Sequence, residues 1–255
     1  MTNKVVKVKQ ATKIVNNGVN EVNTILDHVD LTVNQGDFIT VLGGNGAGKS
    51  TLFNSIAGTI QLTSGSVSIL GKEITHFSEE KRAKHLSRVF QDPKMGTAPR
   101  MTVAENLLLA LHRGEKRTLK NRRLNEQRDY FTSLAAQIGN GLEKHLDTPT
   151  GDLSGGQRQA LSLLMATMKK PDLLLLDEHT AALDPKTSVQ LMELTERRIE
   201  EENLTCLMIT HHMEDALKYG NRLLVMEKGK IIKDLGKEEK RKLTKKDMLL
   251  FFEGA

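Results

Sequence analysis

The sequence predicts a mixed α/β protein with one inserted helical subdomain, and three observations lead to this fold class. A glycine-rich segment, VLGGNGAGKST, stands between a strand-like run and a helix-like run. The segment DLLLLD at 172–177 is a short leucine run between acidic residues, which fits a strand buried on both faces in a parallel sheet. Between these two segments, apolar residues recur at helical spacing from Met101 to about Ile138.

The first third of the chain is predicted to be rich in strands, because apolar alternation, apolar runs and Asn-Gly turn signals all favour them. A helix is expected to begin near Lys49, directly after the glycine-rich segment. The predicted strands are VVKVK (5–9), ILDHVDLTV (25–33), DFITVLG (37–43), a hairpin over SGSVSILGKEI (64–74), and a short strand ending at Phe90.

The second half alternates predicted helices and strands, without an internal repeat. Cys206 is the single cysteine, so it has no partner for an intramolecular disulfide, and we expect it to be buried in a strand. The predicted elements are a helix at 154–169, the strand DLLLLD, a helix at 185–202, the strand LTCLMIT (204–210), a short helix, two strands around 223–232 joined at Lys228-Gly229, and a helix at 243–252.

The composition excludes several classes of protein. With 38% hydrophobic and 27% charged residues, the chain is neither disordered nor fibrous, and no segment approaches the roughly 18 apolar residues of a membrane span. The N-terminus lacks the apolar core of a secretory signal, so we expect a cytoplasmic protein. The net charge of +5 suits an anionic partner, either nucleotide, nucleic acid or lipid. Much of the excess lies in 112–123 and 237–246, which are expected to be solvated helical faces.

The glycine-rich segment has the spacing G-x-x-x-x-G-K-S, which is typical of a loop that binds the phosphates of a nucleoside triphosphate. Backbone N–H groups would face the phosphate oxygens, Lys49 would add a positive charge, and Ser50 would offer a hydroxyl to Mg²⁺. We call this segment the phosphate loop. Its predicted nucleotide-binding residues are Gly43, Gly44, Asn45, Gly46, Ala47, Gly48, Lys49, Ser50 and Thr51.

Two acidic residues, Asp177 and Glu178, follow the leucine run at the carboxyl end of its strand, where open α/β sheets bind ligands. Asp177 would support Mg²⁺, and Glu178 would activate water as a general base. Such a pair also fits an ordinary strand-end turn. A phosphate loop in the same chain favours the catalytic interpretation.

The segment LSGGQ, Leu153–Gln157, discriminates among nucleotide-binding proteins, and we call it the signature. Ser154 and Gln157 have the spacing of a helix capping box. That box does not explain Gly155 and Gly156, because glycines weaken a first helical turn unless something approaches the backbone. An anion fits at this helix N-terminus. With this segment in place, the sequence resembles the ATP-binding cassette family across essentially its whole length.

The resemblance implies the fold and the reaction. The fold would be a P-loop NTPase cassette with a RecA-like mixed-sheet core, an N-terminal antiparallel β subdomain and an inserted α-helical subdomain at about 91–168, all within one ATPase domain at 1–255. The reaction would be hydrolysis of ATP to ADP and phosphate. The family also implies a head-to-tail dimer with a second copy, in which Ser154, Gly155, Gly156 and Gln157 bind the nucleotide held by the partner.

Further residues match family motifs in the right order. Gln91, in VFQDP, resembles the glutamine that reaches Mg²⁺ and the attacking water. Asp184, in AALDP, resembles the aspartate of the family's D-loop at the nucleotide interface, and it also fits an N-cap before Pro185. His211 resembles the histidine that contacts the γ-phosphate and orients Glu178. Its neighbour His212 is expected at the surface.

Three features depart from the family pattern. The aromatic residue that usually stacks on adenine is replaced by Val15 or Ile14, so apolar contact would hold the base and GTP use stays open. His179 stands where proline commonly follows the glutamate, and we do not expect it to bind a metal. Nothing substantial follows Phe252, so we expect no added regulatory domain.

The resemblance further implies that the chain powers a separate membrane permease from the inner face of the cell membrane. The loop and helix at 92–111, with Gly96 and Met101, would receive the permease. The sequences of these motifs are most similar to those of importer ATPases that act with a separate permease and a substrate-binding lipoprotein. The expected cargo is a small solute such as an amino acid. No nucleic acid is expected as a partner. Two alternatives stay open: a soluble cassette ATPase acting on nucleic acid or ribosomes, and a regulatory nucleotide-binding module without turnover.

Overall fold

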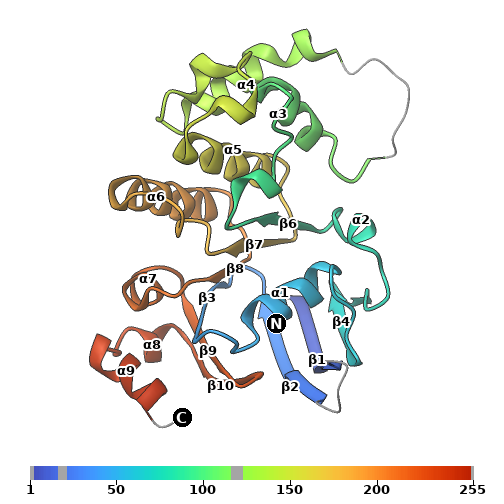
Figure 1. Ribbon diagram of the computed structural model, residues 1–255, viewed down its shortest axis with the longest axis vertical. Helices are drawn as coiled ribbons and strands as arrows, with labels where there is room; N and C mark the ends of the chain where they lie inside the picture. Colours follow the sequence, from blue (N-terminus) through green and yellow to red (C-terminus); the bar gives the residue numbers. More distant parts are fainter. Residues whose placement is uncertain (1–2, 17–21, 116–122, 254–255) are drawn as a thin grey trace.

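The chain folds into two β-sheets and a group of helices (Figure 1). The computed structural model describes residues 3–16, 22–115 and 123–253. The first sheet is antiparallel in every pairing, with strand order β2-β1-β4-β5, as predicted for the N-terminal part. Its strands are β1 (Lys4–Asn16), β2 (Val22–Asn34), β4 (Ser64–Ile69) and β5 (Lys72–Glu73).

The second sheet has the order β10-β9-β3-β8-β7-β6 and is mixed, because β10 alone runs antiparallel to its neighbour. The central strands β3 and β7 are almost completely buried, as their continuous apolar runs predict. This confirms the mixed-sheet core. The strands are β3 (Phe38–Gly43), β6 (Leu86–Val89), β7 (Leu173–Asp177), β8 (Cys206–Ile209), β9 (Arg222–Glu227) and β10 (Lys230–Leu235).

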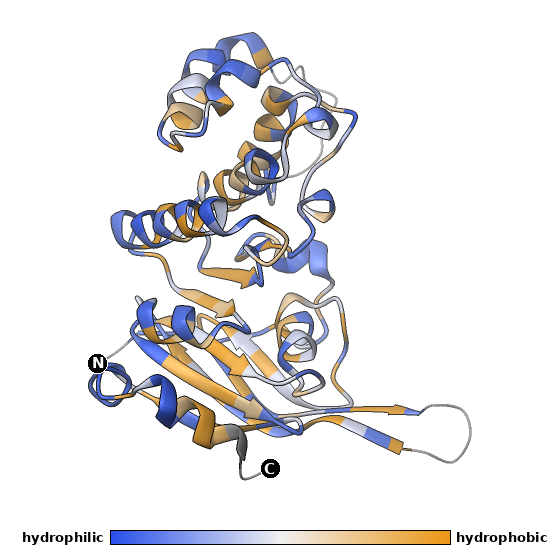
Figure 2. Cartoon of the chain, turned by 60° about the vertical axis from the view of Figure 1, so that its left-hand side comes forward, coloured by the Kyte–Doolittle hydropathy of each residue, from blue (hydrophilic) through white to orange (hydrophobic). Residues whose placement is uncertain are grey.

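Helices cover the mixed sheet, and hydrophobic residues concentrate in its strands (Figure 2). One cluster of buried side chains joins α1 to both sheets, and another lies between the mixed sheet, α5 and α6. Buried Cys206 belongs to the second cluster. The helices next to this sheet and at the C-terminus are α1 (Lys49–Ala57), α2 (Glu79–Arg82), α6 (Pro185–Glu201), α7 (Met213–Lys218), α8 (Lys237–Lys240) and α9 (Lys245–Glu253).

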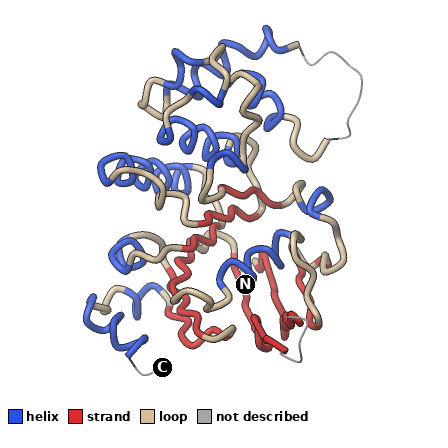
Figure 3. The backbone as a smooth tube through the Cα atoms, in the orientation of Figure 1, coloured by secondary structure: helices blue, strands red, loops and turns tan. Residues whose placement is uncertain are grey.

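A separate group of helices lies at the top of the molecule (Figure 3). It has its own apolar core, in which Leu107, Phe131 and Leu161 are completely buried. The boundaries predicted for this subdomain, about 91–168, stay a prediction. The helices are α3 (Val103–Leu111), α4 (Arg128–Ala136) and α5 (Gly155–Thr167), with short 3-10 turns at Pro93–Met95, Leu124–Gln127, Leu142–His145 and Thr150–Asp152.

The expectation of solvated helical faces fails for 112–115 in the first basic stretch and for Lys240 in the second, while the other charged residues of 237–246 are exposed and most lie in α8 and α9. Residues 112–115 form a turn after α3 and not a helical face, because Gly114 has a φ of 77°, while 116–122 lie outside the described residues. In the second stretch Lys240 is only 4% exposed. Its Nζ donates to the carbonyl oxygens of Tyr219 and Gly220 and to the Thr40 hydroxyl, so this lysine anchors α8 to the core.

The C-terminal end of α1 is held by a buried arginine, Arg82, which is 2% exposed. Its guanidinium donates to the carbonyl oxygens of Ser55 and Ile56, both at 2.7 Å. These carbonyls lie in the last turn of α1, where intrahelical partners are lacking and a cation is favoured. The helix that follows the phosphate loop is therefore fixed at its far end.

Candidate nucleotide site

The phosphate loop joins the buried strand β3 to the first turn of α1. Gly48 has a φ of 97°, and a Cβ there would lie 2.8 Å from the carbonyl oxygen of Ile25 in β2. Only glycine fits both this backbone conformation and this close approach. Gly44, Asn45 and Gly46 are exposed at the tip of the loop, where a ligand can reach them.

Lys49 lies inside the loop with its side chain folded back toward it. The residue is 7% exposed, and Nζ donates to the carbonyl oxygens of Gly43 at 2.6 Å and Gly44 at 3.0 Å. Burial lowers the pKa of Lys49, and the charges of Glu178 and Asp177 oppose that shift. The predicted phosphate-binding lysine and the two predicted acidic residues therefore share one site.

The acidic residues lie at the end of β7, next to β8. Glu178 has a φ of 44°, in the left-handed region that is rare for non-glycine residues. Its Oε2 is 3.4 Å from Nδ1 of His211, which follows β8. The predicted general base and the predicted histidine thus lie within contact distance of each other. His212 is exposed, as predicted, and its ring centroid lies 4.1 Å from that of His211.

The residues predicted to serve Mg²⁺ carry oxygen donors. Ser50 is exposed on the first turn of α1, Gln91 is exposed two residues after the end of β6, and Asp177 ends β7. In the described part of the chain, no group of three or more His, Cys, Asp or Glu side chains could hold a metal ion. Mg²⁺ commonly binds one or two protein oxygens together with nucleotide phosphates, so this donor set fits it.

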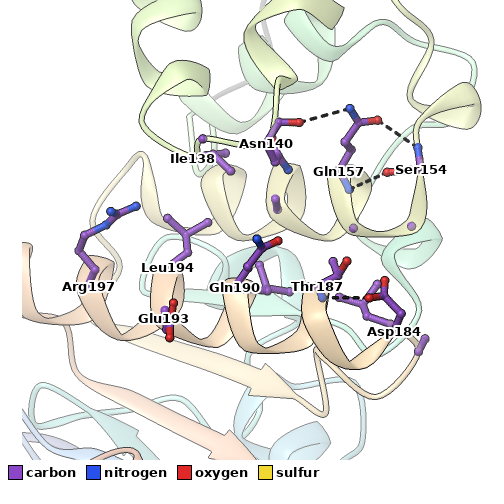
Figure 4. A pocket seen from close by; sticks show the side chains of 17 residues that line it. Ile138, Asn140, Ser154, Gln157, Asp184, Thr187, Gln190, Glu193, Leu194 and Arg197 are labelled. Atoms are coloured by element: carbon purple, nitrogen blue, oxygen red, sulfur yellow. Dashed lines mark hydrogen bonds between the residues drawn. The ribbon is translucent and has the colours of Figure 1, made fainter.

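The signature and Asp184 line a groove of about 800 Å³ between α5 and α6 (Figure 4). The predicted capping box is present: Gln157 N donates to Ser154 Oγ, and Ser154 N donates to Gln157 Oε1, both at 3.2 Å. Asp184 caps α6 by accepting from Thr187 N at 3.1 Å, as predicted. Hydrogen bonds from Thr187 lower the pKa of Asp184. Both helix N-termini therefore open onto the same groove.

The two glycines of the signature have different reasons to be glycine. A Cβ on Gly156 would lie 2.5 Å from the Thr187 methyl carbon, so this glycine is required by packing of α5 against α6. A Cβ on Gly155 would meet only Leu183, at an ordinary 3.6 Å. Packing against Thr187 is thus a reason for glycine at 156 that the sequence did not indicate. The binding of an anion at Gly155 and Gly156 stays a prediction.

The structure shows the contacts of Val15 and His179, the two residues that depart from the family pattern. Val15 is half-buried and pairs with Asn23 on the β1–β2 hairpin, while Leu26 of the same hairpin adjoins Gly48. His179 is 2% exposed, Nε2 is 3.0 Å from the Thr195 hydroxyl, and burial lowers its pKa to about 4. It therefore packs inside the protein as a neutral residue.

Three residues near the site were not predicted. Arg88 of β6 forms an ion pair with Asp177, Gln159 of α5 donates to the Phe90 carbonyl at 2.9 Å, and Arg158 donates to the Thr150 carbonyl at 2.8 Å in the loop before the signature. The available signal for Arg88 was a lone charge inside the apolar run of β6. No local pattern indicates what the two side chains of α5 contact.

The family model described as ABC transporter matches residues 26–181. The tyrosine transport ATP-binding protein of Clostridioides difficile (strain R20291) is 45% identical over 249 residues, covering 98% of this chain and 99% of the relative. The phosphonates import ATP-binding protein of Lactococcus lactis subsp. lactis (strain IL1403) is 33% identical over 232 residues, covering 90% of this chain and 92% of the relative.

Solved structures agree with the fold. The dimeric structure of a post-hydrolysis ATP-binding cassette bound to ADP and Pi is 27% identical, with a TM-score of 0.78, covering 91% of this chain and 98% of that one. The ADP conformation of another ABC transporter cassette is also 27% identical, with a TM-score of 0.76, covering 98% of both chains. The predicted cassette fold is confirmed.

Proposed function

This chain belongs to the ABC transporter family as an ATP-hydrolysing importer subunit, and from that premise we propose that its cargo is tyrosine or a chemically similar amino acid. One observation carries the proposal: the 45% identity to a tyrosine transport ATP-binding protein extends over 98% of this chain and 99% of the relative. The cargo would be bound by other chains of the importer, including a separate permease and an extracytoplasmic substrate-binding lipoprotein.

In the proposed site, the phosphate loop binds the triphosphate of ATP. Lys49 exchanges its hydrogen bonds with the Gly43 and Gly44 carbonyls for bonds to phosphate oxygens, which compensates the cost of burying its charge. Ser50, Gln91 and Asp177 would hold Mg²⁺, which when bound neutralises charge on the phosphates. Val15 would contact the base from the β1–β2 hairpin.

For hydrolysis, we assign Glu178 as the general base that takes a proton from the attacking water. His211 would hold the Glu178 carboxylate through the 3.4 Å contact and would reach the γ-phosphate. Gln91 would orient the same water. This division of work is supported by the placement of Glu178 and His211 at the ends of adjacent parallel strands.

The nucleotide site would be completed by a second copy of the chain. Among the described residues, no hydrogen bond or ion pair joins the phosphate loop to the signature. A head-to-tail dimer would bring Ser154 and Gly155 of one copy to the ATP of the other, and the matching dimeric cassette supports this arrangement. The free N–H groups at the start of α5 suit the γ-phosphate.

The permease would dock beside Gln91. A groove of about 400 Å³ there is lined by Phe90, Gly96, Leu109 and Met165. Nearby Met95 is 69% exposed and Leu109 is 44% exposed, so apolar surface is available to a partner. No helix in the described ranges is long and apolar enough to cross a membrane. We therefore propose that the chain attaches to the inner membrane face through its permease.

Uptake of radiolabelled tyrosine tests the cargo. In cells that lack the gene, uptake should fall, and the wild-type chain should restore it while Glu178→Gln should not. Unlabelled phenylalanine and tryptophan should compete more strongly than alanine. Unchanged tyrosine uptake in the deletion strain would remove the cargo proposal and leave the ATPase assignment intact.

Affinity purification of the Glu178→Gln chain from detergent-solubilised membranes tests the partners. We expect a multi-spanning permease, accompanied by a lipoprotein. Recovery of ribosomes or nucleic acid without any membrane protein would instead favour a soluble cassette ATPase. Phosphate release by the complex purified with the wild-type chain separates both outcomes from a module without turnover.

A further inference from the structure

Arg88 connects two parts of the nucleotide site through its guanidinium. It lies in β6, in parallel register with Leu175 of β7. Nη2 is 2.5 Å from Asp177 Oδ2, and Nη1 donates to Asn54 Oδ1 of α1 at 2.6 Å. The side chains of the ion pair are only 13% and 15% exposed, so water screens this pair weakly.

The position of Arg88 is also tied to the segment that leads to Gln91. The guanidinium carbon lies 4.6 Å from the centre of the Phe90 ring, a cation–π distance. The Phe90 carbonyl accepts a hydrogen bond from Gln159, which is 1% exposed in α5. Arg88 thus contacts both Asp177 and the Phe90 ring. The Phe90 carbonyl in turn joins this segment to α5, the helix that follows the signature.

These contacts place a fixed positive charge against the carboxylate that we assign to Mg²⁺. A cation already bound to one carboxylate oxygen weakens the attraction of that carboxylate for a second cation. We propose that Arg88 is a positioning residue that competes with Mg²⁺ for Asp177 and so raises the Mg²⁺ concentration needed for nucleotide binding. The inference rests on the proposed metal site, and it concerns a residue that lies outside the sequence motifs described above.

A purely structural ion pair makes a different prediction. If Arg88 only joins β6 to β7 and α1, its loss lowers the stability of the fold and leaves the metal requirement unchanged. If it competes with Mg²⁺, its loss lowers the metal requirement. The two roles are therefore separated by a metal titration and not by activity alone.

The test is binding of a fluorescent ATP analogue to the purified full-length chain over a range of Mg²⁺ concentrations. Arg88→Met should lower the half-saturating Mg²⁺ concentration by about tenfold, the change expected when one nearby charge is lost. Arg88→Lys keeps the charge and should stay near wild type. Arg113→Met is the matched control, because Arg113 and Arg88 both line the groove beside Gln91, but Arg113 donates to the carbonyls of Ala166 and Lys169.

A second background makes the test specific. When Asp177→Asn is present, Arg88→Met should no longer shift the Mg²⁺ requirement, because the competing partner is gone. An unchanged or higher Mg²⁺ requirement in Arg88→Met, or an equal shift in the Asp177→Asn background, overturns the proposal. Circular dichroism checks the fold, and Arg88→Gln replaces Arg88→Met if that variant is unfolded.

This experiment separates the inference from the proposed function. It needs neither permease nor cargo, so an error about tyrosine does not affect it. A wild-type chain that fails to bind the nucleotide with Mg²⁺ would contradict the proposed nucleotide site itself. Wild-type binding with no effect of Arg88→Met would contradict the role of Arg88 alone.

Discussion

At the scale of residues, the site combines groups from separate parts of the chain. Lys49 comes from α1, Glu178 from the end of β7 and His211 from the end of β8. Sequence motifs predicted each of these residues, because each lies in a local pattern of strand, loop and helix. Arg88 escaped prediction because its significance depends on Asp177 and Asn54, which are 89 and 34 residues away along the chain.

Replacement of Glu178 by glutamine tests the proposed base. Glutamine keeps the shape of the side chain but cannot accept the proton, so turnover should fall by at least about 100-fold. Affinity for ATP with Mg²⁺ should stay within about twofold, since the phosphate loop is unchanged. Phosphate release and nucleotide binding measure the two effects. Glu201→Gln, at the exposed end of α6, is the control, and wild-type turnover in Glu178→Gln would refute the assignment.

At the scale of elements, local signals predicted where helices begin. The Ser154–Gln157 capping box and the Asp184 cap both occur as expected, because caps depend on residues within one turn. The packing of α5 against α6 was not predicted, since no sequence pattern places Thr187 over Gly156. For the same reason the burial of Lys240 was missed: its charge suggests a surface position, and only the docking of α8 places it inside.

Alanine substitutions separate the two signature glycines. Gly156→Ala should lower the free energy of unfolding by about 1–3 kcal/mol, because the new methyl group overlaps Thr187. Gly155→Ala should cost little stability, since space is present. Denaturant unfolding followed by circular dichroism measures both. Thr187→Ser removes the overlapping methyl group and should restore the stability of the Gly156→Ala variant. Equal stability of the two glycine variants would disprove this packing argument.

At the scale of the whole molecule, α8 is held to the mixed sheet by the buried Lys240, which donates to the Thr40 hydroxyl of β3. Burial lowers the pKa of Lys240 from 10.5 to about 8. Between these two values, the unfolded chain binds more protons than the folded chain at this residue. The contribution of Lys240 to the free energy of unfolding therefore rises as pH increases from 8 toward 10.5, and it is constant below pH 8.

A comparison of wild type with Lys240→Met measures this dependence. The difference between their free energies of unfolding should shift in favour of wild type by about 1 kcal/mol per pH unit between pH 8 and 10. Taking the difference removes the titration of other groups. Denaturant unfolding at several pH values provides the data. A difference that does not change with pH would mean that Lys240 titrates as an exposed lysine.

The left-handed backbone of Glu178 has a consequence for how this chain evolves. Its φ of 44° carries a conformational cost of about 1 kcal/mol for a residue with a Cβ, and glycine avoids that cost. With Glu178 as the proposed base, mutation from glutamate to glycine at this position moves toward higher stability and away from activity. Selection for transport must therefore retain the glutamate although glycine at this position would be more stable. In lineages that lose the transported nutrient, inactive and more stable variants at residue 178 are the ones expected to accumulate.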